Sequence, residues 1–147
     1  MNLNASYFSL SPVLNSRYLL DRWLNPRSHR HTINLRGHPL AIEWTHRAHR
    51  VMQRRSSPLI VELQLYFSCV IKKRVLFHDR AELSLTRVSD YLAIGFRPVQ
   101  AASCDLVEFA RDYPVKREFD SSAAARMHPR ALRIDYQNGR FEGEYEL

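Results

Sequence analysis

The chain has 147 residues, 45% of them hydrophobic and 25% charged, and its 22 Lys+Arg exceed its 15 Asp+Glu to give a formal charge of +7. A chain of this length can bury about two thirds of its unfolded surface, so we expect one globular domain over residues 1–147 without a metal or disulfide. With 4 Gly and 7 Pro, collagen-like and low-complexity classes are excluded, and the apolar content argues against disorder.

The cellular compartment is predicted from the cysteines and the apolar runs. Cys69 and Cys104 are too few for a disulfide scaffold and indicate reduced thiols. The N-terminus lacks a basic leader ahead of an apolar core, which argues against a secretory signal. The longest apolar-rich run, residues 59–71, is too short and too polar to cross a bilayer. We therefore expect a cytoplasmic protein without membrane insertion.

The positive charge is unevenly distributed along the chain. Residues 1–74 hold twelve Lys+Arg and three acids, a net +9, whereas residues 75–147 have a net charge of −2. All but three of the basic residues are arginine, whose planar guanidinium suits phosphate and carboxylate groups. Codon bias in a GC-rich genome would also produce this arginine content, so composition alone does not establish an anionic partner.

In chain order, residues 1–10 lack a period and are expected to form a loose arm. Ser11-Pro12 then predicts a helix start, because a hydroxyl N-cap followed by proline suits the first turn. This first helix should end near Trp23-Leu24, before Asn25-Pro26. Residues 26–37 form a basic connector that contains one apolar pair at strand spacing, Ile33 and Leu35, and closes at Gly37.

A second helix is predicted over residues 39–55. One side has apolar residues at the spacing of a single buried stripe, namely Leu40, Trp44, Ala48 and Val51. The other side is polar and basic, with Glu43, His46, Arg47, His49, Arg50, Arg54 and Arg55. Residues 56–58, Ser-Ser-Pro, should end this helix.

The most regular strand pattern covers residues 59–71. Odd positions from Leu59 to Ile71 are apolar, while Glu62, Gln64 and Ser68 occupy even positions. This period of two predicts one core face and one face toward solvent or a partner, and it favours an antiparallel sheet. The basic residues Lys72, Lys73 and Arg74 are expected to mark the end of the strand or a bend.

Shorter elements follow. Residues 91–99 are predicted as a strand whose Pro98 belongs at an edge or a bulge. Ser103 could cap a short helix up to Ala110, residues 115–119 are a third strand candidate, and residues 121–127 could form a helical turn.

The C-terminus has the local chemistry of a β-hairpin. Asn138-Gly139 is the favoured type I′ turn, because both central residues adopt positive φ. A two-residue loop pairs Gln137 with Arg140 and leads to the pairs Tyr136–Phe141, Arg133–Glu144 and Leu132–Tyr145. Asp135 then faces Glu142, a like-charge pair that Arg140 could relieve. Together the elements predict an α+β fold, with N-terminal helices packed on an antiparallel sheet of four or five strands that ends in this hairpin.

Three kinds of chemistry can be tested against the sequence. Glu43, His46 and His49 could share a metal on one helix face, but the ligand set is incomplete, arginines surround it, and we expect no cofactor. Five histidines lie within 21 positions (His29, His31, His38, His46 and His49), which could equally be a basic surface. Cys69 continues an apolar strand face, whereas Cys104 at a helix start could be a reactive thiol.

The leading functional hypothesis is a small non-enzymatic binding or accessory protein. Its basic N-terminal half would contact an acidic protein partner, with RNA or DNA binding through the same residues as the alternative, since arginines alternate there with Tyr18, Trp23 and Trp44. A metal- or thiol-dependent enzyme ranks third. The acids Glu142, Glu144 and Glu146 could neutralise the basic half within one chain or across a homodimer. The contact residues proposed are Arg27, Arg30, Arg36, Arg47, Arg50, Arg54, Arg55, Lys72, Lys73 and Arg74.

Overall fold

The computed structural model describes residues 20, 23–24, 26–67, 70–101, 116–118 and 126–147. These residues form a mostly β structure around the nine-residue helix α2 (His46–Arg54). The strands, in order, are β1 (His29–Leu35), β2 (His38–Trp44), β3 (Leu59–Phe67), β4 (Ile71–His78), β5 (Thr86–Arg87), β6 (Leu92–Ala101), β7 (Lys116–Glu118), β8 (Ala131–Gln137) and β9 (Arg140–Glu146).

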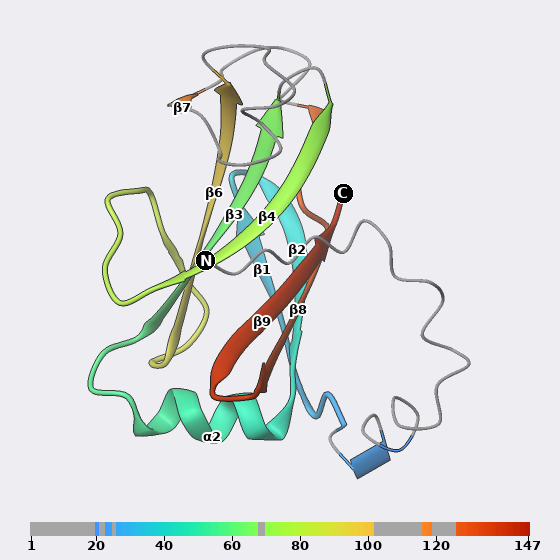
Figure 1. The fold of residues 1–147 in the computed structure, drawn as a ribbon, viewed down its shortest axis with the longest axis vertical. Coiled ribbons are helices and arrows are strands. Elements are labelled where there is room, and N and C mark those ends of the chain that lie inside the picture. Colours follow the sequence, from blue (N-terminus) through green and yellow to red (C-terminus); the bar gives the residue numbers. More distant parts are fainter. Residues whose placement is uncertain (1–19, 21–22, 25, 68–69, 102–115, 119–125) are drawn as a thin grey trace.

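The strands form two sheets. One has the order β1-β2-β8-β9, and the other has the order β4-β3-β6-β5, with β7 also paired to β6. Both sheets are mixed, because β2 pairs with β8 in parallel and β3 pairs with β6 in parallel, while the remaining pairs are antiparallel. In Figure 1 the two sheets run alongside one another, and α2 crosses the end near the β8–β9 turn.

One hydrophobic core joins both sheets. Apolar side chains from β2, β3, β6 and β8 fill it, and Leu40, Ile42, Leu63, Ile94 and Ile134 are fully buried. The side chains of β4 and β9 tie the sheets together at one edge, since Lys73 Nζ donates to the Tyr145 carbonyl at 2.8 Å. Tyr145 Oη donates in turn to the backbone carbonyl of Gln64 on β3 at 2.5 Å.

The expectation of N-terminal helices packed on one antiparallel sheet is wrong. The predicted helix over residues 39–55 is strand β2 followed by helix α2, which begins only after Thr45. Leu40 and Trp44 are four positions apart, a spacing that fits both a helical turn and two strand periods. Ile42, which lies between them, is just as deeply buried, and this alternation belongs to a strand.

The basic connector at residues 26–37 also proved to be mainly a strand. β1 and β2 form an antiparallel hairpin in which Ile33 faces Leu40 and Leu35 faces His38. Arg36 and Gly37 make its two-residue turn with φ values of 51° and 86°. Positive φ at both positions suits a hairpin turn that matches the twist of its strands, and an arginine in the first position concealed this from sequence.

The sequence located strand β3 correctly, but it did not predict where the strand ends or how its polar side chains are buried. It ends at Phe67, and Ile71 already belongs to β4, so Lys72, Lys73 and Arg74 lie inside a strand rather than after one. The predicted polar face is not exposed to solvent: Glu62 is 4% and Gln64 1% exposed. β3 has β4 on one side and β6 on the other, one antiparallel and one parallel, so the expected purely antiparallel sheet is wrong as well.

The predicted strand over residues 91–99 corresponds to β6, and β7 falls within the predicted strand over 115–119. On the side of β6 away from β3, β5 pairs with Ala93 and Ile94, and β7 pairs from Val99 onward. Pro98 lies between these two pairings, in keeping with its missing donor. The predicted arm over 1–10 and the predicted helix over 103–110 lie outside the described residues. So do the predicted turn over 121–127, except Arg126 and Met127, and the first helix, except Leu20, Trp23 and Leu24.

The C-terminal hairpin is confirmed in position and register. β8 and β9 pair as predicted from Gln137–Arg140 to Leu132–Tyr145, and Asp135 faces Glu142. Asn138 and Gly139 have φ values of 53° and 76°. Arg140 Nε lies 3.5 Å from Glu142 Oε1, as the sequence suggested.

Candidate interaction surface on helix α2

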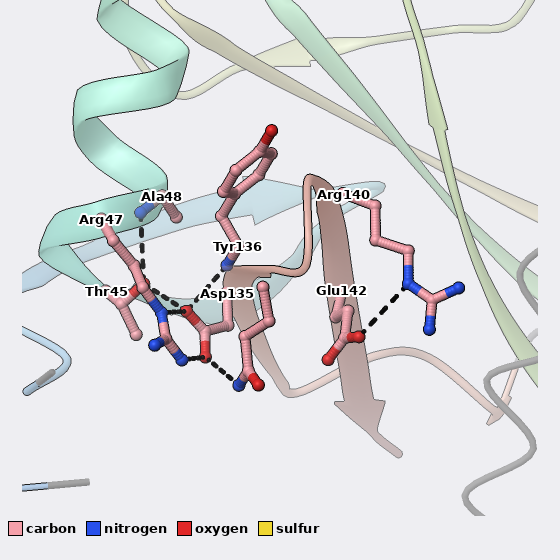
Figure 2. Close-up of polar contacts among 8 residues, drawn as sticks. Thr45, Arg47, Ala48, Asp135, Tyr136, Arg140 and Glu142 are labelled. Carbon is pink, nitrogen blue, oxygen red and sulfur yellow. Dashed lines mark hydrogen bonds and ion pairs between the residues drawn. The ribbon is translucent and has the colours of Figure 1, made fainter. Parts of the chain in front are cut away.

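Helix α2 is fixed to β8 by one aspartate. Arg47 makes a two-pronged contact with Asp135, with Nε 2.7 Å from Oδ1 and Nη2 2.6 Å from Oδ2. Thr45 Oγ1 donates to the same carboxylate at 2.6 Å and accepts from the Ala48 amide at 3.3 Å, so it is both the helix N-cap and part of this network. Figure 2 shows Arg47, Thr45 and the Tyr136 amide converging on Asp135.

This network changes the acidity of Asp135. Burial by itself would raise the pKa of the carboxyl group. Hydrogen bonds from Arg47, Thr45, Gln137 and the Tyr136 amide outweigh burial and lower the pKa to about 2. The carboxylate therefore stays ionised and keeps the N-terminal end of α2 against β8.

With α2 anchored in this way, its basic outer side is exposed. Ala48 and Met52 are buried, whereas His46, Arg50 and Arg54 are exposed. α2 contains no acidic residue. Within the described part of the chain, Arg50 and Arg54 have no ion pair, so their guanidinium groups face solvent.

Most of the other predicted contact arginines are engaged within the protein. Arg30 Nε lies 3.2 Å from Glu43 Oε1 across the β1–β2 hairpin. Arg36 lies 5.7 Å from the centre of the Phe96 ring. Arg55 pairs with Asp79, just after β4. Each of these three side chains therefore has a partner within the described part of the protein.

The remaining predicted residues lie elsewhere. Arg27 lines an open surface hollow of about 190 Å³ together with Arg133, Asp135, Glu142 and Glu144 on the β8–β9 hairpin. Lys73 faces Leu65, near the end of β3 that is farthest from α2, and Lys72 and Arg74 flank it on β4. The ten residues are therefore distributed over the segment before β1, the β1–β2 hairpin, α2 with its C-cap, and β4.

The acidic residues of β9 mainly neutralise their own hairpin. Glu144 and Glu146 lie 3.4 and 2.7 Å from Arg133 Nη1, and Glu142 is next to Arg140. The expected neutralisation of the basic helix by these acids is not seen for Arg50 or Arg54.

The proposed metal ligands do not form a metal site. Glu43 is paired with Arg30, and His46 and His49 take part in ring stacking. Among the residues that the structure describes, no group of three His, Cys, Asp or Glu could hold a metal ion. Cys69 and Cys104 lie outside that part of the chain.

A buried charge cluster on β3 was missed in the sequence. Glu62 Oε2 lies 2.8 Å from His78 Nε2 on β4, and Glu62 Oε1 lies 3.3 Å from Arg97 Nε on β6. Burial would raise the pKa of Glu62, but hydrogen bonds from His78 and Gln64 and the charge of Arg97 lower it overall. The only signal was a carboxylate at an even position of an apolar-rich run, and its partners come from two other strands.

Comparison of the chain with protein-family models, curated proteins and solved structures finds no match. In the described ranges, no helix combines the length and apolar character required for a membrane span.

Proposed function

We propose that this protein is a non-enzymatic binding or accessory protein that contacts an acidic protein partner through the outer side of α2. The observation that carries this proposal is the pair Arg50 and Arg54, two exposed guanidinium groups four positions apart on a helix without acids. Residues at this spacing lie on the same side of a helix, so both can meet one carboxylate-rich surface. His46 lies on the adjacent turn and is exposed as well.

The rigid attachment of α2 supports this role. Arg47 and Thr45 hold the helix on β8 through Asp135, so the exposed arginines project from a fixed position. A preorganised surface loses less conformational entropy on binding than a mobile one. Electrostatic contacts of this kind favour fast association and selection of partners by charge.

We expect Arg50→Glu/Arg54→Glu to weaken binding of a fluorescent poly-glutamate peptide by about tenfold or more, because two attractive contacts become repulsive. Fluorescence anisotropy at low and physiological salt measures this loss. The matched control is Arg126→Glu/Arg130→Glu, which makes the same charge change ahead of β8, at the end away from Asp135. Equal losses in the two variants would mean that only net charge matters and would refute the assignment to α2.

Nucleic-acid binding is the second candidate, and the exposure of the tryptophans bears on it. Trp44 is only 2% exposed and cannot stack on a base, whereas Trp23 is 77% exposed. A single-stranded oligonucleotide of matched charge therefore belongs in the same titration. Tighter binding of the oligonucleotide than of the peptide, lost on Trp23→Ala, would favour this second candidate over an acidic protein.

A further inference from the structure

The inward face of β1 changes from apolar residues to histidines along its length. Leu35 is buried in the core and Ile33 packs against it. The next positions on that face are His31 and His29, which lie opposite Ile42 and Trp44 of β2. Next to α2, the core is therefore lined by imidazole and indole rings rather than by aliphatic side chains.

These rings form a continuous stack between β1 and α2. The His29 and His49 rings are 3.8 Å apart at 14°, close to parallel contact. His29 is also stacked with Trp44 at 5.7 Å and with His46 at 5.8 Å, and His31 is stacked with Trp44 at 5.2 Å. The edge of Tyr91 meets His49 at 5.8 Å. The contact between β1 and α2 therefore depends on imidazoles in face-to-face contact.

One hydrogen bond determines the protonation state in which this stack is stable. Trp44 Nε1 donates to His49 Nδ1 at 3.1 Å, and Trp44 is almost completely buried. Nδ1 can accept only while it carries no proton. Protonation of His49 places a hydrogen on that nitrogen, so the buried indole N–H loses its acceptor and the two donors oppose each other.

The charged groups around the stack offer little compensation for added protons. On β1 and β2, Arg30 pairs with Glu43 on the opposite face of the hairpin. On α2, Arg47 is engaged by Asp135 of β8. The groups that act on His29 are other imidazoles. Burial lowers the pKa of His29, and His49, His46 and His31 lower it further; burial and His46 lower the pKa of His49.

We propose that His29, His49 and Trp44 form a pH-operated latch that holds β1 against α2 while the imidazoles are neutral and opens when they are protonated. Opening separates the stacked rings, frees the N-terminal end of β1 from the helix, and adds positive charge beside Arg50. An acidic partner would then bind more tightly at low pH, a consequence that rests on the proposed function, whereas the latch itself does not.

The pH range in which the latch opens follows from the direction in which the pKa values of His29 and His49 are shifted. Both histidines have a folded-state pKa below their ordinary value of 6.5, so the folded protein favours the neutral rings. The stabilisation is complete above pH 6.5 and is lost as the pH falls from there through the lower folded-state values.

The test follows the indole N–H signal of Trp44 in a nitrogen–proton NMR spectrum of the full chain between pH 8 and pH 4.5. We expect this signal to move with a midpoint below 6.5, in step with the ring signals of His29 and His49. The exposed Trp23 indole provides the internal control, and Trp23→Phe assigns the two signals. A Trp44 signal that stays constant while His49 titrates would overturn the proposal.

Two variants separate the latch from general acid sensitivity. His46→Phe keeps a flat ring beside His29 but removes the imidazole whose charge lowers the pKa of His49, so the midpoint of the Trp44 signal should rise toward 6.5. His49→Gln retains an acceptor for the indole and should abolish the movement. Because His38 and His128 form a separate stack at 3.6 Å, His38→Phe should leave the Trp44 titration unchanged. If His38→Phe shifts that midpoint as much as His46→Phe does, the latch is not local and the proposal fails.

The link to binding is measured separately with the poly-glutamate peptide at pH 7.5 and pH 5.5. Wild-type protein should gain several-fold more affinity at low pH than His29→Phe does. If the Trp44 indole signal moves with pH as expected but the peptide does not bind at either pH, the proposed function fails and the latch stands. If the peptide binds with equal affinity at both pH values, the link between the latch and binding is refuted.

Discussion

Replacing Asp135 with alanine is expected to lower the free energy of unfolding by about 3 kcal/mol. The substitution removes the acceptor shared by Arg47, Thr45, Gln137 and the Tyr136 amide. It removes the ion pair between Asp135 and the Arg47 guanidinium, which is 26% exposed, and the group that orients the N-cap hydroxyl of Thr45. Urea unfolding followed by circular dichroism measures this loss.

The contribution of Asp135 should also depend on pH. Because its folded-state pKa of about 2 lies below the ordinary 3.8, its stabilisation is present above pH 3.8 and is lost as the pH falls through 2. The shift corresponds to about 2 kcal/mol, since one pKa unit is worth about 1.4 kcal/mol. The difference in stability between wild type and Asp135→Asn should therefore shrink between pH 5 and pH 2.

Glu142 provides the matched control, because it faces Asp135 across the hairpin and its Oε1 lies 3.5 Å from Arg140 Nε, a partly exposed ion pair that Figure 2 also draws. We expect Glu142→Ala to change the free energy of unfolding by less than about 0.5 kcal/mol. Equal effects of Asp135→Ala and Glu142→Ala would show that the anchor of α2 adds nothing to stability.

The second large effect is expected at Glu62. Glu62→Ala should cost about 3 kcal/mol, because it removes the buried carboxylate that pairs with both Arg97 and His78. The Glu62 side chain is 5% exposed, whereas its partners are 27% and 32% exposed and can recover part of their hydration. Glu62→Gln keeps the shape without the charge and should lose less. Thermal and urea unfolding at pH 7.5 measure both variants.

Glu144→Gln is the control for this experiment, because Glu144 also pairs with an arginine but is 51% exposed. Its expected effect is less than about 0.5 kcal/mol. If Glu62→Gln were as mild as this control, the desolvation of the carboxylate would cancel its attraction to Arg97 and His78. The cluster would then specify the arrangement of β4, β3 and β6 without stabilising it.

The structure also separates residues that the charge pattern had grouped together. Arg47 and Arg50 lie three positions apart on α2, yet one is held by Asp135 and the other faces solvent. Lys73 was proposed as a partner contact, and in the structure its Nζ donates to the carbonyl of Tyr145. Net charge along the chain could not distinguish these cases, because the carboxylate or carbonyl that engages each cation is distant in sequence.

The sequence by itself determined the elements whose geometry is local. The Asn138-Gly139 turn fixes the pairing of β8 with β9, because a two-residue loop leaves one register in which the apolar side chains share a face. The apolar alternation likewise located β3 and β6. Only the tertiary structure decided that residues 38–44 form a strand. The spacing of Leu40 and Trp44 fits both the helical and the strand period, and it is the pairing with β1 that selects the strand.

The tertiary structure also decided that β3 is buried on both faces and that β2 and β8 pair in parallel. Such pairings join segments far apart in the chain, and they form because burial of the shared core outweighs the local preferences of either segment. For the same reason, the sequence showed where positive charge is concentrated along the chain, but only the folded structure showed which cations have partners. Several of the proposed cations have partners within the protein, whereas Arg50 and Arg54 are exposed on α2.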